Sequence, residues 1–471
     1  MSAAQSNLKR SITLTQATGV AFHQVLGGGV IALMGTAIAL TGAGTPLAFL
    51  VAGIAVLVYS LPVITIGSAM PAVGGRYSYA ARLLSPSAGF FTMWMTILVT
   101  IQLSMVTLAA GHYVQAILPW ADAKIVAVSI MALFFVLNLF GAALSSKVGI
   151  YLGIVMIVAF AMYGVLGMPQ VDWSHFTEQM PNGGGNFWYA AALLTFATTG
   201  AVAVVSDIGG EMKRPKRDIP IAVIVGTLLT VALYIFVAIP AVGVSGVEDS
   251  AGKTLIEMGS SFLSSGQSLF FVIGGALFAV IGHVNSLLTA ATKPVLAGIE
   301  DGWLPRGLGS VNRRFGTPHW LLLGLFVIGA GPVVLGISVE ALAGIAGLCS
   351  GLVMAVLLIG SWRLHVKWPE AYRAAPFALK KGPHLALVII GLGILVVQTV
   401  LLFNRLTDAN KISLVVWLVL GLVVWFMRRG SVAALKQPAR GPVAAEVKES
   451  SESADSASSA NSADPASNET R

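Results

Sequence analysis

Apolar stretches long enough to cross a lipid bilayer recur along almost the whole chain. A transmembrane helix needs about 20 predominantly apolar residues, and twelve stretches near or above this length alternate with short polar or Gly- and Pro-containing connections. Their approximate bounds are 19–40, 45–70, 89–118, 125–144, 148–168, 187–208, 219–242, 269–299, 320–337, 341–361, 385–403 and 414–426. Only 10% of the residues are charged, against about 25% in soluble globular proteins. We therefore expect an all-α integral membrane protein with twelve transmembrane helices embedded in a lipid bilayer.

The basic residues are distributed as expected for a protein whose two ends lie on the same side of the membrane. With the N-terminus placed in the cytoplasm, 24 of the 28 Lys and Arg residues fall on the cytoplasmic side. The four on the other side are Lys124, Lys253, Arg405 and Lys411. Cytoplasmic loops of membrane proteins carry such an excess, which predicts a multi-pass protein of the inner or plasma membrane with both termini cytoplasmic. The net charge of +8 then reflects topology and attraction to anionic lipids, and it does not indicate a nucleic-acid partner.

Several other classes of protein are excluded by what the chain contains. The single cysteine, Cys349, excludes a disulfide framework and a Cys-based metal site. The seven histidines show no metal-ligand spacing, and there is no H-E-x-x-H motif. We therefore expect neither an enzyme nor a protein with a metal or an organic cofactor. Residues 1–18 are expected to form a cytoplasmic N-terminus, and the Ser-, Ala- and acid-rich residues 430–471 a disordered cytoplasmic tail.

Two of the apolar stretches contain residues that disfavour a regular helix. Gly27, Gly28 and Gly29 lie in the middle of the first stretch, and each costs roughly 1 kcal/mol in a helix interior relative to Ala. The sixth stretch contains the run Phe196, Ala197, Thr198, Thr199 and Gly200. Close packing between helices is one explanation of such small residues, and local unwinding that exposes backbone polar groups is the other.

Corresponding interruptions in two halves of a membrane protein indicate a transporter built from inverted repeats, with its binding site near the bilayer midplane. Helix N-termini at such breaks attract an anionic group, and freed carbonyls attract an ammonium group. We therefore expect helices one and six to be broken and to bind a zwitterion such as an amino acid.

Three motifs in the predicted cytoplasmic connections resemble those of one known family. The first is P-A-V-G-G-R-Y-S-Y at 71–79, continued by Pro86, Gly89, Phe90 and Trp94. The second is G-E-M-K-R-P-K-R-D-I-P at 210–220. The third is D-G-W-L-P at 301–305, preceded by Asn285 and Lys293 and followed by Pro318. In this order the sequence resembles the amino acid–polyamine–organocation superfamily of permeases.

The resemblance implies a LeuT-like fold and secondary active transport of amino acids or related amines by alternating access. Two five-helix inverted repeats would occupy 19–168 and 187–361, with helices eleven and twelve (383–428) at the periphery. The substrate carboxylate would meet Gly27–Gly29, and an aromatic residue of helix six would cover the substrate. Phe196 is the candidate for that cover, although one extra residue before Glu211 leaves Ala197 as an alternative. Thr198, Thr199, Gly200 and Ser350 complete the expected substrate site.

Four further residues are candidates for gating or coupling to a proton gradient. Asp207 and Glu211 end helix six near Lys213 and its basic neighbours, where they either compensate charge at a helix end or form an inner-gate ion pair. His283 lies within helix eight, two residues before Asn285. It either bonds a neighbouring carbonyl or titrates near the transport path, because only histidine changes charge near neutral pH without special tuning. His23 and His112 are expected near span ends.

The helix-five lysine that substitutes for sodium in some proton-coupled relatives has no counterpart, since Met156 takes the matching position.

The expected substrate is a neutral amino acid. No Asp or Glu occurs between residues 11 and 121, and a second ammonium group at the midplane would need a fixed counter-charge. A polyamine or organic-amine permease is the alternative within the same class, and a transporter-like nutrient sensor is the alternative outside it.

Overall fold

The computed structural model describes residues 10–140, 146–177, 184–312, 314–430 and 432, and almost all of the tail predicted at 430–471 lies outside them. Across this part of the chain the structure is helical, and its one β feature is an isolated bridge between Ile12 and Met212. The all-α membrane fold is therefore confirmed.

The first five predicted apolar stretches coincide with helices. Their bounds are α1 (Leu14–Leu26), η1 (Gly27–Ile31) and α2 (Ala32–Thr41) for the first; α3 (Thr45–Ala69) for the second; α5 (Pro86–Val99) and α6 (Gln102–Ile117) for the third; and α7 (Ala123–Leu139) and α8 (Ser146–Gly167) for the fourth and fifth. The connecting elements are η2 (Gly42–Gly44), α4 (Gly75–Leu83), η3 (Met168–Gln170) and η4 (Trp173–Phe176).

The next seven stretches coincide with helices as well. They are α9 (Gly184–Ile208), α10 (Pro215–Gly243), the run α13 (Ser265–Phe270), η7 (Phe271–Leu277) and α14 (Phe278–Glu300), then α15 (His319–Val334), α16 (Val339–Lys367), α18 (Lys381–Arg405) and α19 (Asp408–Arg428). Short connections are η5 (Gly209–Glu211), α11 (Gly246–Ser250), α12 (Leu255–Met258), η6 (Gly259–Ser261), η8 (Arg306–Gly309) and α17 (Pro369–Arg373).

Nine helical runs in the described residues are long and apolar enough to span a membrane, the first of them containing α1 to α3 together. The helices α7 and α15 are apolar but shorter, with 17 and 16 residues. The protein is thus a multi-pass membrane protein, while the count of twelve crossings stays a prediction.

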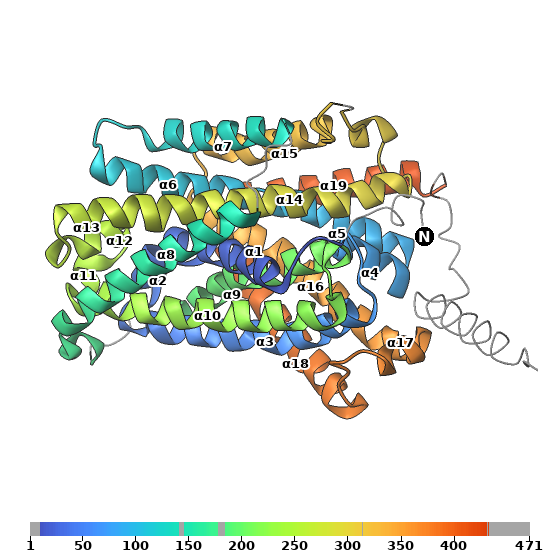
Figure 1. Ribbon diagram of the computed structural model, residues 1–471, viewed down its shortest axis with the longest axis horizontal. Coiled ribbons are helices and arrows are strands. Elements are labelled where there is room, and N and C mark those ends of the chain that lie inside the picture. The colour runs from blue at the N-terminus through green and yellow to red at the C-terminus, as the bar shows by residue number, and fades with distance from the viewer. Residues whose placement is uncertain (1–9, 141–145, 178–183, 313, 431, 433–471) are drawn as a thin grey trace, which may run out of the picture.

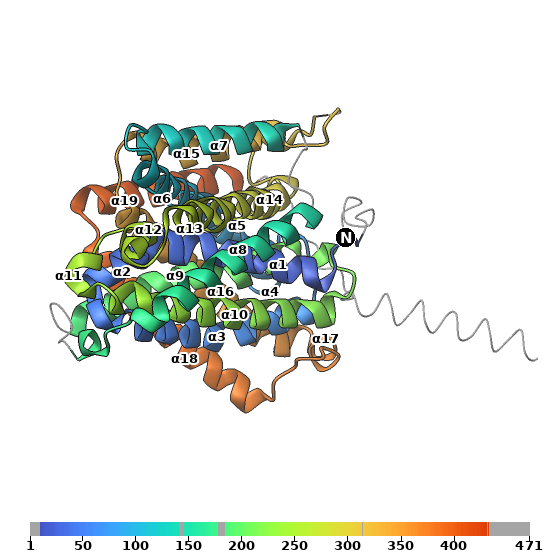
Figure 2. The same cartoon turned by 60° about the vertical axis from the view of Figure 1, so that its left-hand side comes forward.

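The helix α1 occupies the centre of the bundle, where it packs against α8, α9, α10 and α14 (Figures 1 and 2). The helices α7 and α15 lie side by side at one edge. At the periphery, α18 packs on α3 and α16, and α19 packs on α5. Most of the apolar side chains of α19 are exposed, as expected of a helix that faces lipid.

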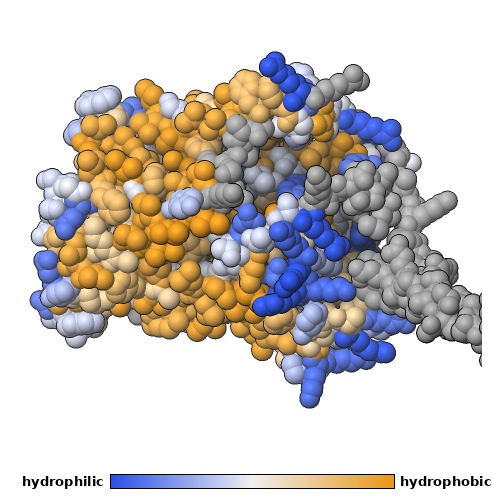
Figure 3. Space-filling model, viewed as in Figure 1, coloured by the Kyte–Doolittle hydropathy of each residue, from blue (hydrophilic) through white to orange (hydrophobic). Residues whose placement is uncertain are grey.

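The surface is divided into a broad apolar region and a hydrophilic end. Apolar residues cover most of the visible face, and strongly hydrophilic residues gather at the right-hand side (Figure 3). That side is where α1 begins and α14 ends (Figure 1). We call it the basic end, because Arg76 of α4, Lys293 of α14 and Lys213 of the connection between η5 and α10 lie there. The other side, where α2 ends, is called the opposite end.

The two predicted helix breaks differ in the structure. The backbone at Gly27–Ile31 leaves the α-helical pattern but continues as a π-helix, so helix one is interrupted without being unwound. By contrast, α9 is a continuous α-helix through residues 196–200, and the predicted break in helix six is wrong. The hydroxyls of Thr195, Thr198 and Thr199 donate to carbonyls four residues earlier, at 2.7–2.9 Å. These bonds are compatible with a helix, so the threonines do not require freed carbonyls.

Gly200 is explained by packing instead. A Cβ atom at this position would lie 2.8 Å from the Gln24 Cγ. The glycine therefore lets α9 approach α1 closely, which is the alternative explanation that the sequence left open.

Candidate functional site

The glycine segment of helix one lies at the centre of the protein, and all five residues of η1 are buried. A Cβ at Gly27 would lie 2.8 Å from the His283 Cβ, whereas a Cβ at Gly28 would make ordinary contacts of 3.4 Å and 3.6 Å with His283 and Met105. The ring of Tyr234 packs directly on Gly29, and its hydroxyl donates to the Val25 carbonyl. The segment is thus fixed by close packing on two sides, and a π-helix at this place is typical of functional sites.

A small cavity lies between α1, α4, α5, α6, α9, α14 and α16. Its lining includes three of the predicted site residues, Phe196, Gly200 and Ser350, together with Gln24, Gln102 and Arg76. The volume of about 20 Å³ suffices for about one water molecule. The Gln24 amide nitrogen lies 3.4 Å from the His283 Nε2, and the Gln24 Oε1 is buried without a hydrogen-bond partner among the described residues. An unused acceptor of this kind is a candidate ligand for a donor group.

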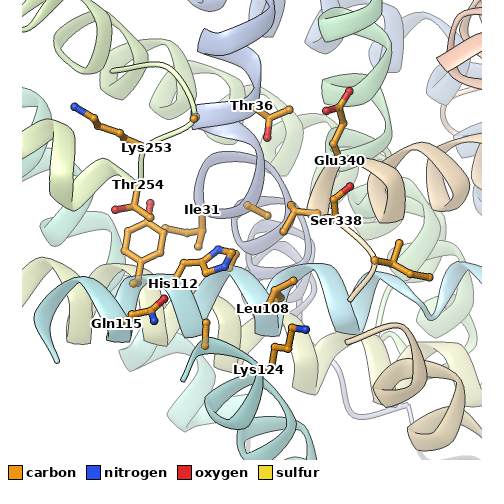
Figure 4. A pocket seen from close by; sticks show the side chains of 18 of the residues that line it. Ile31, Thr36, Leu108, His112, Gln115, Lys124, Lys253, Thr254, Ser338 and Glu340 are labelled. Carbon is orange, nitrogen blue, oxygen red and sulfur yellow. The ribbon is translucent and has the colours of Figure 1, made fainter. Parts of the chain in front are cut away.

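A larger cavity of about 540 Å³ opens at the opposite end. Its residues from helix one are Ile31, Ala32, Gly35 and Thr36, so its floor reaches the end of η1. Figure 4 shows Ile31 and His112 near its centre, with Lys253 and Thr254 on one side and Ser338 and Glu340 on the other. A volume in this range accommodates a small organic molecule.

The basic end is closed by two ion pairs. Arg76, at the start of α4, lies 2.5 Å from the Asp207 carboxylate, and the two side chains are only 6% and 0% exposed. The second pair joins Lys293 of α14 to Glu211 of η5 at 2.6 Å, with 12% and 22% exposure. Both acidic residues were predicted as gate candidates. Their partners come from helices distant in sequence, not from the basic cluster that follows Glu211.

Backbone contacts reinforce this closure. The amide of Gly74 donates to the Asp207 carbonyl at 2.9 Å, and the amide of Ile12 donates to the Glu211 carbonyl at 3.0 Å. The segment before α1, the start of α4 and the end of α9 are therefore joined at one point.

A third cavity, of about 190 Å³, lies inside the basic end between α1, α8 and α14. It is lined by His23, Asn285, Glu211 and Lys293, among others. His23 is only 4% exposed, so its side chain packs inside the bundle and is not exposed at a helix end. It sits inside the bundle because glycines of α8 and α14 leave room for its ring. His283 is also buried but does not line this cavity.

The remaining predicted site residues are buried on α9. Ala197 and Thr198 do not line the small cavity, and the Thr199 hydroxyl is bonded to the Tyr59 hydroxyl. Sequence reasoning missed Gln24, Gln102 and Arg76. The two glutamines carried a usable signal, because each is a polar residue within an otherwise apolar stretch.

The sequence is similar to those of several named transporters. The branched-chain amino acid permease BcaP of Bacillus subtilis (strain 168) is 25% identical over 466 residues, which cover 92% of this chain and 96% of the relative. The serine/threonine exchanger SteT of the same organism is 25% identical over 333 residues, or 68% and 75% of the two chains. The methylthioribose transporter of Bacillus subtilis is 25% identical over 449 residues, which cover 89% of this chain and 94% of the relative.

These relatives are named for transport and not for catalysis, which agrees with the expectation that the protein is not an enzyme. A family model described as "Amino acid permease" matches residues 12–428, as the motif resemblance predicted. The chain therefore belongs to the amino acid permease family.

Proposed function

We propose that the protein is a secondary active transporter that moves a neutral amino acid across the membrane by alternating access. The observation that carries the proposal is the order of the cavities along helix one. Residues 12–23 contact the basic-end cavity, Gln24 contacts the small cavity, and residues 31–36 contact the cavity at the opposite end. An alternating-access carrier needs a central binding site with a barrier on each side. In this order the small cavity is the central site, and a barrier separates it from each end.

The two barriers differ in chemistry. On one side, the packed residues Gly27–Gly29, with His283 and Tyr234, separate the small cavity from the opposite end. On the other side, the Arg76–Asp207 and Lys293–Glu211 pairs tie the basic end together. The ion pairs are the inner gate in this proposal, with the basic end in the cytoplasm, because 24 of the 28 basic residues then lie inside.

The small cavity supplies groups suited to an amino acid. The Gln24 Oε1 accepts from the substrate ammonium, and Phe196 covers the substrate side chain. Gly27–Gly29 do not line the cavity in this structure, so in this proposal their amides receive the carboxylate only after η1 rearranges. The cavity must widen for this, since about 20 Å³ is far smaller than any amino acid. The less regular hydrogen bonding of a π-helix makes η1 the segment suited to rearrange.

The lining favours a neutral substrate. Among the described residues around the small cavity the one charged side chain is Arg76, and there is no carboxylate. Asp207 already neutralises Arg76, so a cationic substrate would find no free counter-charge in the lining, which is unfavourable at low dielectric.

In this proposal the long helices within 19–168 form the first inverted repeat, and those within 187–361 form the second. The third helix of each repeat is irregular, at Thr100–Ile101 between α5 and α6 and at η7 before α14, which supports the assignment.

Counterflow in proteoliposomes tests the function. Vesicles loaded with unlabelled isoleucine, valine, serine or threonine should accumulate the labelled form transiently, while protein-free vesicles should not. Unlabelled neutral amino acids should compete better than arginine, lysine or putrescine. Stronger competition by putrescine or arginine would contradict the neutral substrate and favour an amine permease. Binding without flux would indicate a sensor.

A further inference from the structure

We propose that His23 is the proton-binding site that couples amino acid movement to a proton gradient, with the proton entering through the basic-end cavity. This inference rests on the proposed transport function and names the group that would drive it.

The tautomer of His23 follows from its single polar contact. The Nε2 atom lies 2.9 Å from the Gly149 carbonyl oxygen on α8. A carbonyl can only accept, so Nε2 carries the hydrogen, and in the neutral ring Nδ1 is a bare lone pair. This atom is buried and has no hydrogen-bond partner among the described residues. A basic nitrogen in this situation is a proton acceptor with no competing donor.

The position of the ring is fixed by glycines on both sides. A Cβ at Gly282 of α14 would overlap the imidazole at Nδ1, and a Cβ at Gly153 of α8 would lie 3.2 Å from Nε2. The ring therefore occupies a slot between α8 and α14 that side chains would fill. Protonation in this slot converts Nδ1 into a donor, which changes how α1 contacts the two neighbouring helices.

The proton has a route to the ring. His23 lines the cavity of about 190 Å³ at the basic end, which is large enough for several water molecules. His283, the other buried histidine of this region, does not line it. The next residue of α1, Gln24, lines the small cavity and contacts His283. The proton site and the proposed substrate site are thus carried by consecutive residues of one helix.

Three elements near His23 carry charged or titratable groups. Glu211 of η5 and Lys293 of α14 lie in the same cavity and are paired with each other. His283 is the neighbour on α14 after Gly282. On α9, Asp207 is occupied by Arg76. Protonated His23 would therefore gain Glu211 as a counter-ion when the Lys293 pair opens, which links proton binding to the inner gate.

Purified full-length protein in vesicles of phosphatidylethanolamine and phosphatidylglycerol provides the test. The probe is whichever of labelled isoleucine, valine, serine or threonine gives wild-type counterflow. Uptake is measured at equal pH and with one side of the membrane at about pH 6 and the other at about pH 7.5. Movement of protons is followed with a pH-sensitive dye inside the vesicles.

In the wild type, the gradient should stimulate uptake, and the amino acid should move protons in the same direction. In His23→Gln and His23→Asn, counterflow at equal pH should persist, while gradient stimulation and amino-acid-dependent proton movement should be lost. His283→Gln and the distant His319→Gln should retain the stimulation. Gly282→Ala, which keeps every histidine but crowds the His23 ring, should weaken it.

Three results would overturn the inference. The first is gradient stimulation that survives in both His23 variants. The second is loss of stimulation in His283→Gln alone. The third is wild-type counterflow without any proton movement, which would leave the transport function intact and make the protein an uncoupled exchanger. Should both His23 variants fail to fold, the proton measurement on the wild type and on Gly282→Ala still decides. Absence of counterflow with every amino acid would instead contradict the transport function itself.

Discussion

Arg76 donates three hydrogen bonds to the Asp207 carboxylate, from its backbone amide at 3.1 Å, from Nε at 2.8 Å and from Nη2 at 2.5 Å. Both side chains are almost fully buried at the basic end. A buried pair adds little net stability relative to apolar residues, but loss of one partner leaves an uncompensated charge. The pair therefore specifies how the start of α4 meets the end of α9.

Replacement of one member of this pair should destabilise the protein strongly. Arg76→Ala leaves Asp207 buried without a cation, which typically costs about 3–5 kcal/mol. The double variant Arg76→Met, Asp207→Leu should recover much of the loss. Thermal unfolding in detergent measures both, with Lys411→Ala as the control, because its pair with Asp408 is exposed. A single variant as stable as this control would show that the pair is not needed for closure.

Weakening the second pair should open the basic end. Glu211→Gln removes the charge that holds Lys293 at 2.6 Å, so the conformation open at this end should become more populated. In a Cys349→Ser background, Ser286→Cys places a thiol in the basic-end cavity. Its rate of maleimide labelling should rise in Glu211→Gln. An unchanged rate would make Glu211 a charge that compensates a helix end.

The glycines of η1 should respond very differently to the same substitution. Gly29→Ala places a methyl group inside the ring of Tyr234, whereas Gly28→Ala makes only van der Waals contacts. Overpacking of a dense core costs about 1–3 kcal/mol or more. We expect Gly29→Ala to lower the melting temperature clearly and Gly28→Ala to change it little. Gly28→Leu should insert into the membrane but abolish amino acid binding, and wild-type binding by that variant would contradict the substrate site.

The partial burial of Asp301 should make stability depend on pH. Burial raises the pKa of the Asp301 carboxyl above its ordinary value of 3.8, and the bond from Tyr77 at 2.5 Å opposes this only in part. Folding therefore favours the protonated acid, and this contribution is lost as pH rises upward from about 3.8.

Asp301→Asn keeps an acceptor for Tyr77 and removes the titration. The melting temperature of this variant should rise relative to that of the wild type as the pH is raised from about 4 to about 7. The gain should be small, since Asp301 is partly exposed. The exposed control Asp408→Asn should show no such trend, and a constant difference across this range would contradict the argument.

The sequence predicted the fold well because a bilayer imposes strong constraints. Apolar length located the long apolar helices, and the motifs in the connections indicated the family. The continuous α9 was not predictable, since threonine hydroxyls satisfy carbonyls inside a helix as readily as they would at a break. The irregularities at Thr100–Ile101 and η7 were also missed. They depend on the side chains that pack against these segments, which the local sequence does not show.

The candidate site was predicted less completely than the fold. Phe196, Gly200 and Ser350 line the small cavity, whereas Gly27–Gly29 pack against His283 and Tyr234 and do not line it, and their role in binding stays a prediction. Arg76 was identified only as part of a motif, because its pairing with Asp207 joins residues 131 positions apart. His23 looked interfacial, since its burial depends on glycines in two other helices. Contacts of this kind are set by tertiary packing and leave no local pattern.

Gln24 should determine how the substrate ammonium is recognised. Its Oε1 is the buried acceptor without a partner beside the small cavity. Gln24→Leu has a similar volume but no acceptor, and an unpaired ammonium typically loses about 1–3 kcal/mol, or roughly five- to 150-fold in affinity. Gln24→Glu introduces a carboxylate, which should shift competition toward arginine and lysine relative to neutral amino acids. Both are measured by inhibition of counterflow, with Thr399→Val as a control, because this residue lies on α18 away from the cavity. A Gln24→Leu variant with wild-type affinity would move the ammonium site away from helix one.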